Sequence, residues 1–506
     1  MNIDNKYYYL TLVMSHIYER GRDVFLRKRL ILFLGITLFY GCNQSIVSKK
    51  DIEKPNVLFV VFDDLNDWEQ LLGGHPQAIT PNIDRLAKRG VLFSNAHAAG
   101  TMCCPSRASV ITGLRPSTTG VYKNSDTPLY LYKKKQTLNK HFKEEGYYVA
   151  GAGKILHKFY YEEEDWHETF GRRREEGIVY HRDNPESQNI TKLENSSLSW
   201  GPFSTPDSLT FDARSVEWIS DRLEDTRDQP FFLACGIFRP HIPWFNPQQY
   251  FDKYPIDQIQ LPMVKENDLT GVSLQGRHIA YSTSNFTKPD DLHNTIENAE
   301  HESFVKNEMW DDAVQAYLAS VTYADAQFGK LLDALDKSAH ADNTIIILWS
   351  DHGWHLGEKE HWRKATLWEQ VTRVPLIVSG PNVKGGTSCT QAVSLLDIYP
   401  TLIEMCNLES VDGLEGESLV PQLMNPKNIR DIPAISSLGP DYHAVRDERY
   451  RYISYGDGQE ELYDHNVDPE EWNNIAGDND YAGVIDRLKV HVPINCAIPV
   501  QGSYTK

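Results

Sequence analysis

The chain has 506 residues, a formal net charge of −19 at pH 7, and 41% hydrophobic and 11% aromatic residues. A chain of this length exceeds what a single hydrophobic core organises, so a large domain and a smaller one are expected. The acidic balance argues against nucleic acid as a partner and against long-range attraction of a polyanion. Local cations or a metal must therefore capture any anionic substrate.

The N-terminal residues resemble an export signal. The basic triplet Arg27-Lys28-Arg29 precedes an apolar run at 30–40, which is too short to span a membrane. Gly41-Cys42 follows and resembles a bacterial lipoprotein cleavage site. We predict an N-terminal extension and signal peptide at 1–41, lipidation of Cys42, and an exported protein that is periplasmic, anchored to the outer membrane as a lipoprotein, or secreted. The alternative is an ordinary signal peptide cut nearby.

Strands alternate with helices through most of the chain. The run at 56–62 is continuously apolar and ends at Asp63-Asp64, a pattern typical of buried strands in parallel sheets. Further strands are predicted at 147–152, 231–238, 344–349 and 374–378, and helices at 80–86, 138–145 and 310–337. This alternation predicts an α/β sandwich around a mostly parallel sheet.

The pattern changes in two polar stretches and again near the C-terminus. Residues 160–228 and 255–308 are polar and predicted to be irregular. Beyond about residue 430, short strands are predicted at 442–446, 450–455 and 461–463, followed by a helix at about 481–491. We therefore divide the chain after the signal peptide into a main domain at 42–430 and a small antiparallel C-terminal subdomain at 431–506.

Polar side chains follow the predicted strands at one edge of the sheet. They are Asp63, Asp64, Lys154, Arg239, His241, Asp351 and His352. Ligands of open α/β sheets bind at the carboxyl ends of the strands, so these residues are expected to form one site. Three carboxylates packed together would repel one another, so a divalent cation is expected, and oxygen ligands favour Ca²⁺ or Mg²⁺ over Zn²⁺. The alternative for Asp63-Asp64 is a strand-end turn with a helix-capping aspartate.

The segment Cys103-Cys104-Pro105-Ser106-Arg107 carries a candidate reactive group. Proline favours the first position of a helix, so Cys103 is expected at the N-terminal end of a short buried helix, where free N–H groups and the helix dipole favour negative charge. Arg107 falls one turn later on the same face. This arrangement suits an anionic reacting group. The alternative is that Cys103 is a buried structural thiol.

This segment, followed by Thr112-Gly113, resembles the signature of the formylglycine-dependent type I sulfatases. Companion motifs follow in family order and most resemble the iduronate-2-sulfatase-like subgroup; they include Gly153-Lys154-Ile155-Leu156-His157, Arg239-Pro240-His241 and Asp351-His352-Gly353. The resemblance implies an alkaline-phosphatase-like sandwich with a large, mostly parallel central sheet. It also implies that 42–430 is the sulfatase catalytic domain and that the small antiparallel subdomain follows it.

The resemblance also implies a role for each site residue. Cys103 would be oxidised to Cα-formylglycine by a formylglycine-generating or sulfatase-maturating enzyme. The implied ligands of Ca²⁺, with Mg²⁺ as the alternative, are Asp63, Asp64, the modified Cys103, Asp351 and His352. Lys154, His157 and Arg107 would hold the hydrated aldehyde, His241 would face the leaving-group oxygen, and Lys364 would bind the sulfate.

Some positions depart from the family pattern or have no assigned role. Arg239 stands where the subgroup more often has lysine, and we expect it to tune substrate binding. Arg363 beside Lys364 leaves the register of the sulfate-binding lysine open, and we expect His355 and His361 to lie at the surface.

The seven cysteines are too scattered for a dense disulfide framework, and the sequence leaves one or two disulfides open. A vicinal disulfide between Cys103 and Cys104 would be strained, so Cys104 is expected to be a packed free thiol.

The implied activity is hydrolysis of sulfate esters of carbohydrates. Export, the subgroup and the polar stretches point to uronate- or rhamnose-containing oligosaccharides from glycosaminoglycans or algal ulvan. The arginines at 172–174 are candidates for contacting a uronate. The alternatives are a phosphate or phosphonate ester hydrolase of the same superfamily, and a non-catalytic glycan-binding homologue in which Cys103 stays unmodified.

Overall fold

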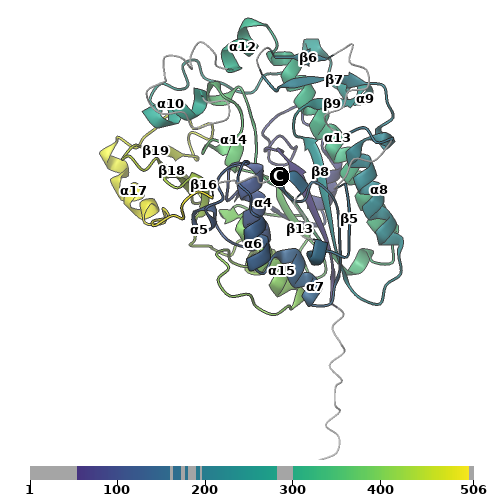
Figure 1. The fold of residues 1–506 in the computed structure, drawn as a ribbon. Helices are drawn as coiled ribbons and strands as arrows, with labels where there is room; N and C mark the ends of the chain where they lie inside the picture. The colour runs from purple at the N-terminus through teal and green to yellow at the C-terminus, as the bar shows by residue number, and fades with distance from the viewer. Residues whose placement is uncertain are drawn as a thin grey trace, which may run out of the picture. The chain divides into compact units, whose positions relative to one another are not determined.

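The computed structural model of the protein contains a central eight-stranded sheet (Figure 1), with the order β14-β2-β13-β10-β1-β8-β4-β5. The strands are β1 (Asn56–Asp63), β2 (Gly90–Phe93), β4 (Tyr148–Gly153), β5 (Glu168–Phe170), β8 (Phe231–Pro240), β10 (Thr344–Ser350), β13 (Leu376–Ser379) and β14 (Thr387–Cys389). Strands β10, β1, β8, β4 and β5 run parallel, whereas β13 is antiparallel to both β10 and β2. The predicted large, mostly parallel sheet is confirmed.

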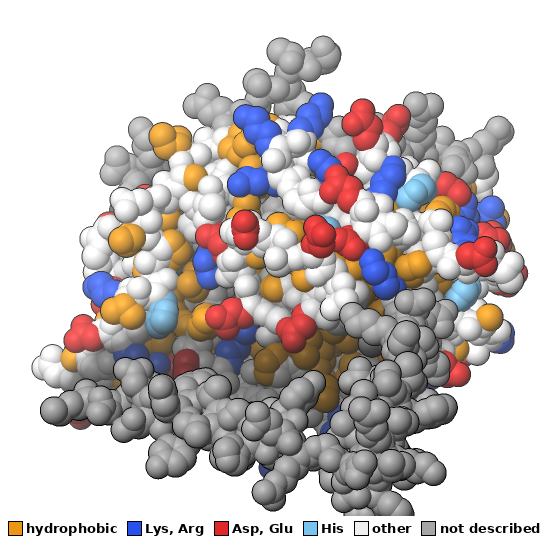
Figure 2. All heavy atoms as spheres, turned by 90° about the horizontal axis from the view of Figure 1, so that it is seen from below, with side chains coloured by type: hydrophobic (Ala, Val, Ile, Leu, Met, Phe, Trp, Pro, Cys, Tyr) orange, Lys and Arg blue, Asp and Glu red, His pale blue; other side chains and the backbone are white. Residues whose placement is uncertain are grey.

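The structure describes residues 54–159, 163–171, 177–180, 190–193, 196–281 and 300–500. The predicted signal peptide, Cys42 and the arginines at 172–174 lie outside these ranges. Within them, no helix has the length and apolar character that crossing a bilayer requires. Figure 2 shows acidic and basic side chains interspersed over the described part of the face seen from below. The negative net charge of −19 therefore does not form an acidic patch on that face.

The apolar sequence of β1 follows from its central position. Both neighbours, β10 and β8, pair with it in parallel, and every one of its residues is buried. Leu58, Val60 and Phe62 point into one hydrophobic core, which β1 shares with α13 (Trp310–Lys337), while the residues between them point into a second core on the opposite face. Because both faces are covered, the strand shows no alternation of polar and apolar residues.

Helices cover both faces of the sheet. Besides α13 they are α3 (Pro81–Ala87), α4 (Cys103–Thr112), α5 (Pro116–Thr119), α6 (Leu129–Lys134), α7 (Leu138–Glu144), α8 (Phe211–Glu224), α9 (Gln248–Phe251), α10 (Leu274–Tyr281), α12 (Glu300–Lys306), α14 (Glu369–Thr372), α15 (Ile398–Cys406) and α16 (Val420–Met424). The bounds of α13 match the prediction. Helices α8, α10 and α12 correct the prediction that 160–228 and 255–308 are irregular. In α8 the buried face is narrow, with Val216, Ile219 and Leu223 set among charged residues, so the stretch looked uniformly polar.

The C-terminal part contains the expected small antiparallel sheet, in the order β16-β17-β18-β19. Its strands are β16 (Ala434–Gly439), β17 (Tyr442–Arg446), β18 (Tyr450–Ser454) and β19 (Glu460–Asp464), and α17 (Ala482–Lys489) packs against it. The sequence missed β16. The domain boundaries after residues 41 and 430 stay predictions.

Short strands form the remaining sheets: β6 (Thr191–Lys192), β7 (Ser199–Phe203) and β9 (Trp244–Pro247); β11 (His355–Leu356) and β12 (Trp362–Arg363); β15 (Val393–Ser394) and β3 (Ala96–His97).

Strands β4 and β8 approach so closely at Gly236 that only glycine fits. A Cβ atom there would lie 2.1 Å from the carbonyl carbon of Lys154, which is backbone and cannot rotate away. We expect Gly236→Ala to lower the free energy of unfolding by about 1–3 kcal/mol, the usual cost of overpacking. Chemical denaturation measures this change. Gly477→Ala is the control because its Cβ would meet open space, and equal stability of the two variants would contradict the expectation.

Candidate active site

The ends of the parallel strands bring the predicted acidic residues together. Asp63 is the last residue of β1, Asp64 follows it, and Asp351 follows β10. All three side chains are fully buried, and one oxygen from each lies within 4.8 Å of the others. The convergence expected from the strand order is therefore present, while the chemical roles of the residues stay predictions.

Cys103 is the first residue of α4 and is fully buried. The helix is preceded by Met102 in an extended conformation and ends at Gly113, whose φ of 68° is the left-handed conformation that glycine adopts easily. Pro105 is the third residue of the helix and not the first, which corrects the predicted start by two residues. The position of Cys103 at the N-terminal end agrees with the prediction.

Arg107 lies one turn along α4 and binds the carboxylates. Its Nε donates to Asp351 Oδ2 at 2.7 Å, and its Nη2 donates to Asp63 Oδ1 at 3.1 Å. Its Nη1 donates to the backbone carbonyls of Lys154 and Ile155. Arg107 thus fixes the ends of three strands relative to one another. Its Nη2 also donates to Phe62 O at 3.5 Å, and none of these bonds goes to the Cys103 sulfur.

Nitrogen atoms surround the Cys103 sulfur. Lys364 Nζ lies 2.9 Å, His352 Nε2 3.3 Å and Lys154 Nζ 3.7 Å from Sγ. Burial raises the pKa of the thiol and Asp63 adds to this, but Lys154 and Lys364 outweigh both and hold the pKa below its ordinary value. The pocket therefore favours a negatively charged group at this position.

Asp64 has an unusual conformation and an unsatisfied oxygen. Its φ is +67°, a conformation that is costly outside glycine and is held here by neighbouring contacts. Oδ1 accepts from Lys364 Nζ at 2.7 Å, whereas the buried Oδ2 has no hydrogen-bond partner within the described part of the chain. Burial raises the pKa of this carboxyl to about 7, against the opposing charge of Lys364. A buried, unpartnered carboxylate oxygen beside two further carboxylates fits a hard divalent cation.

We expect this acidic cluster to bind Ca²⁺ or Mg²⁺ and to stabilise the fold when it does. A ligand at 100 times its Kd adds about 2.7 kcal/mol to the free energy of unfolding. Thermal unfolding of chelator-treated protein, with and without each ion, measures the shift in Tm. Asp63→Asn is expected to remove the shift, and Asp325→Asn, a buried carboxylate on α13, is expected to keep it. No shift with either ion in the unmodified protein would count against the site.

The predicted histidines lie at the same edge with distinct environments. His241 Nδ1 donates to Ile242 O at 2.6 Å, which leaves Nε2 facing Asp64 Oδ2 at 3.7 Å. Neither ring nitrogen of His157 has a hydrogen-bond partner among the described residues. Burial, and then the charge of Lys154, lowers the pKa of both histidines well below the usual value. Neutral imidazoles at these positions are able to accept protons.

Three other predicted residues have structural partners. His355 and His361 are buried, so the prediction of a surface position is wrong: His355 Nε2 lies 2.8 Å from Thr366 Oγ1, and His361 contacts backbone carbonyls. Both are buried because the charged run that contains them folds inward. Arg239 is also buried, and its guanidinium donates to Phe245 O in β9 at 2.6 Å. This arrangement anchors the β8–β9 turn.

The cysteines within the described ranges are all free thiols. Cys104 is buried as predicted, and its Sγ donates to Asp126 O at 3.5 Å.

One residue that supports the site, Tyr317, could not be identified from the sequence. The hydroxyl of Tyr317, on α13, donates to Asp64 O at 2.8 Å and accepts from the backbone N–H of Asn66 at 3.1 Å. These bonds help to hold the strained Asp64 backbone. Tyr317 lies within the predicted helix at 310–337, and no sequence motif links it to the strand end.

Comparison with known proteins identifies relatives along most of the chain. The family profile described as Sulfatase matches residues 55–408, and the profile described as N-sulphoglucosamine sulphohydrolase, C-terminal, matches 357–494. A protein of Formosa agariphila named Sulfatase is 36% identical over 494 residues, which cover 95% of each chain. Iduronate 2-sulfatase of Homo sapiens is 30% identical and covers 78% of this chain and 73% of its own. An Ulvan-active sulfatase of Formosa agariphila is 27% identical and covers 88% and 81%.

Solved structures resemble the fold. A 2-O GAG sulfatase superposes with a TM-score of 0.65 at 23% identity, covering 87% of this chain and 91% of its own. A phosphonate monoester hydrolase of Agrobacterium radiobacter superposes with a TM-score of 0.66 at 22% identity, covering 86% and 94%. The fold is the alkaline-phosphatase-like sandwich.

Proposed function

Because this chain belongs to the sulfatase family, we propose that it hydrolyses sulfate esters of carbohydrates by means of a formylglycine formed from Cys103 and a divalent cation. One observation carries the proposal: Lys364, His352 and Lys154 converge on the buried Cys103 sulfur at the N-terminal end of α4. Donors fixed in a buried site stabilise charge that develops on a reacting group far better than water does.

The residues present fit both groups. When in place, the formylglycine supplies the oxygen nucleophile and the cation supplies Lewis-acid stabilisation. Asp63, Asp64, Asp351 and His352 would hold the cation, which we propose is Ca²⁺, with Mg²⁺ as the alternative.

The chain's own side chains then divide the remaining work. Lys154 and Lys364 neutralise negative charge on the sulfate oxygens. His241, fixed through Nδ1, presents Nε2. Once Nε2 has taken up a proton beside the anionic sulfate, His241 acts together with Lys364 to neutralise or protonate the departing sugar oxygen. His157 has no competing partner in the described part of the site and is available to accept a proton as sulfate leaves. Arg107 orients Asp63 and Asp351.

The proposed substrates are oligosaccharides from sulfated polysaccharides, with uronate- or rhamnose-containing glycans such as glycosaminoglycans or ulvan as the leading candidates. The relatives named Ulvan-active sulfatase and Iduronate 2-sulfatase support this class. Desulfation of a panel of defined sulfated glycans, with released sulfate quantified, tests it. No release from any glycan would contradict the proposal.

Two further measurements separate the rival activities. Parallel assays of aryl sulfate and aryl phosphate or phosphonate esters compare sulfatase with phosphoester hydrolase activity, and faster phosphoester cleavage would favour the latter. Peptide mass spectrometry of Cys103 from the native host detects formylglycine. An unmodified thiol would favour a non-catalytic glycan-binding homologue and exclude processing by a maturating enzyme.

We further propose that the protein is exported and lipidated at Cys42. The basic and apolar pattern before Gly41-Cys42 supports this, and mass spectrometry of the mature N-terminus tests it. An intact Met1 in the native host would overturn export.

A further inference from the structure

The turn that carries Lys364 has a strained backbone. We call residues 359–365 the Lys364 turn. Four of its residues have positive φ although none is glycine: Lys359 (56°), Glu360 (50°), Arg363 (87°) and Ala365 (69°). Two of them flank Lys364 directly. Such conformations are unfavourable and persist only where the surroundings hold them, so the contacts around the turn determine where the Lys364 ammonium lies.

Arg363 is held by a multidentate contact with α12 and a neighbouring segment. Its Nε donates to Glu300 Oε2 at 2.6 Å and its Nη2 donates to Glu300 Oε1 at 2.5 Å. Its Nη2 also donates to Ser196 Oγ at 2.8 Å, and its Nη1 donates to Ser197 Oγ at 2.9 Å. The pair is largely removed from solvent, with side-chain exposures of 15% for Arg363 and 9% for Glu300. Paired hydrogen bonds of this kind fix the plane of a guanidinium.

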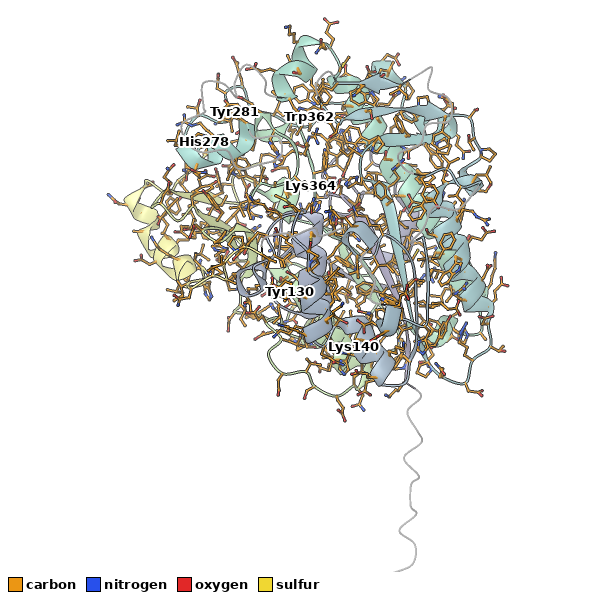
Figure 3. The ribbon with its side chains drawn as sticks, in the orientation of Figure 1. Tyr130, Lys140, His278, Tyr281, Trp362 and Lys364 are labelled. Atoms are coloured by element: carbon orange, nitrogen blue, oxygen red, sulfur yellow. The ribbon has the colours of Figure 1, made fainter. Side chains whose placement is uncertain are left out.

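The preceding residues of the turn, Trp362 and His361, contact α12 and α10. Trp362 stacks on Phe304 of α12 with ring centroids 3.6 Å apart, and its Nε1 donates to His301 Nδ1 at 3.3 Å. His361 has one ring nitrogen 2.7 Å from Ala280 O and the other 3.1 Å from Lys364 O. Figure 3 shows Trp362 between α12 at the top and Lys364 nearer the centre of the ribbon.

The C-terminal end of the turn is hydrogen-bonded to the segment that leads into α4. The N–H of Ala365 donates to Thr101 O at 3.1 Å, two residues before Cys103. The Lys364 turn thus spans the distance between α12 and the start of α4, and its lysine reaches Cys103 Sγ at 2.9 Å and Asp64 Oδ1 at 2.7 Å.

We propose that Glu300 and Arg363 are positioning residues that set the Lys364 ammonium against the reacting group. This inference rests on the proposed function, since it assigns to two residues outside the strand-end site a task in that same reaction. Displacement of about 1 Å at a reacting centre is enough to cost roughly a hundredfold in rate. Without the Glu300 carboxylate, Arg363 loses its ion pair and keeps only the two serine hydrogen bonds of its side chain, so we expect the lysine that follows it to shift.

A double-mutant cycle tests the proposal. Glu300→Gln is expected to lower kcat/KM about tenfold in the natural background and less than about twofold in a Lys364→Ala background, because residues that act through one group are not additive. Glu300→Asp is expected to recover part of the loss. The matched control is Glu415→Gln, whose carboxylate also pairs with an arginine, Arg115, with exposures of 23% and 24%. This pair lies just beyond the C-terminal end of α4, opposite the end that carries Cys103. We expect it to change kcat/KM by less than about twofold.

Binding of inorganic sulfate gives a readout that does not need turnover. Sulfate is expected to raise the Tm of the natural protein and to raise it less in Glu300→Gln and in Lys364→Ala. Should Glu300→Gln fail to fold, Ser196→Ala and Ser197→Ala, each of which removes a hydrogen bond to Arg363, take its place in both measurements.

The outcomes separate this proposal from the proposed function. Equal losses in the two backgrounds, or natural kcat/KM and sulfate binding in Glu300→Gln, would overturn the positioning role. Lack of desulfation by the natural protein would instead overturn the proposed function, and the sulfate-binding comparison would still decide whether Glu300 acts on the anion site.

Discussion

Replacing Cys103 with alanine is expected to lower the rate of desulfation by roughly 10³-fold or more, because the variant lacks the group that becomes the nucleophile. The surrounding cations would still bind the sulfate group, so KM is expected to change far less than kcat. Steady-state kinetics on the best glycan substrate measures both. The side chain is fully buried and small, so the variant is expected to fold.

The adjacent residue supplies the control for this experiment. Cys104 is also fully buried in α4, but its thiol contacts Asp126 O, away from the acidic cluster. Cys104→Ala also removes one cysteine sulfur from this helix. It is expected to keep activity within a few-fold and to lower the free energy of unfolding by about 1 kcal/mol. Activity in Cys103→Ala would show that the chemistry does not depend on residue 103, and an equal loss in both variants would show that the loss is not specific to it.

The strand-end cluster was predictable because a single rule governs it. β1 and β10 are continuous apolar runs that each stop at a carboxylate, and parallel neighbours place such stops at the same edge. Asp63 and Asp351 therefore meet although they lie far apart in the chain. The position of Lys154 follows from the same rule, because β4 is parallel to β8 and Lys154 is the first residue after β4.

Direction and long-range contacts were not predictable in this way. An apolar run has the same pattern in either direction, so the strand at β13 was expected but its antiparallel pairing was not. His361 stands in a charged run that is typical of a surface, and long-range contacts such as the one with Ala280 O of α10 bury it. Glu300 and Ser196 come from polar stretches with no marked periodicity. Their convergence on Arg363 depends on tertiary structure alone.

Changing Asp64 to asparagine is expected to reduce kcat/KM by at least about 10²-fold, more than altering the helix start at Pro105. A cation acting as a Lewis acid supplies several kcal/mol of transition-state stabilisation, and each 1.36 kcal/mol is about tenfold in rate. A helix N-terminus supplies only about 0.3–1 kcal/mol. Asparagine tolerates the left-handed backbone at this position, where φ is +67°, so the substitution removes charge without adding strain.

Pro105→Ala is the comparison that ranks the two effects, because it alters the first turn of α4 and leaves the carboxylates unchanged. We expect it to lower kcat/KM by less than about tenfold. Asp64 also accepts a hydrogen bond from Lys364, so part of its loss would come from a misplaced ammonium. Measuring the Ca²⁺ dependence of Tm in Asp64→Asn separates the two contributions, since only loss of the cation removes that dependence. Equal and small losses in Asp64→Asn and Pro105→Ala would show that the cation does not contribute more than the helix start, and the ranking would be wrong.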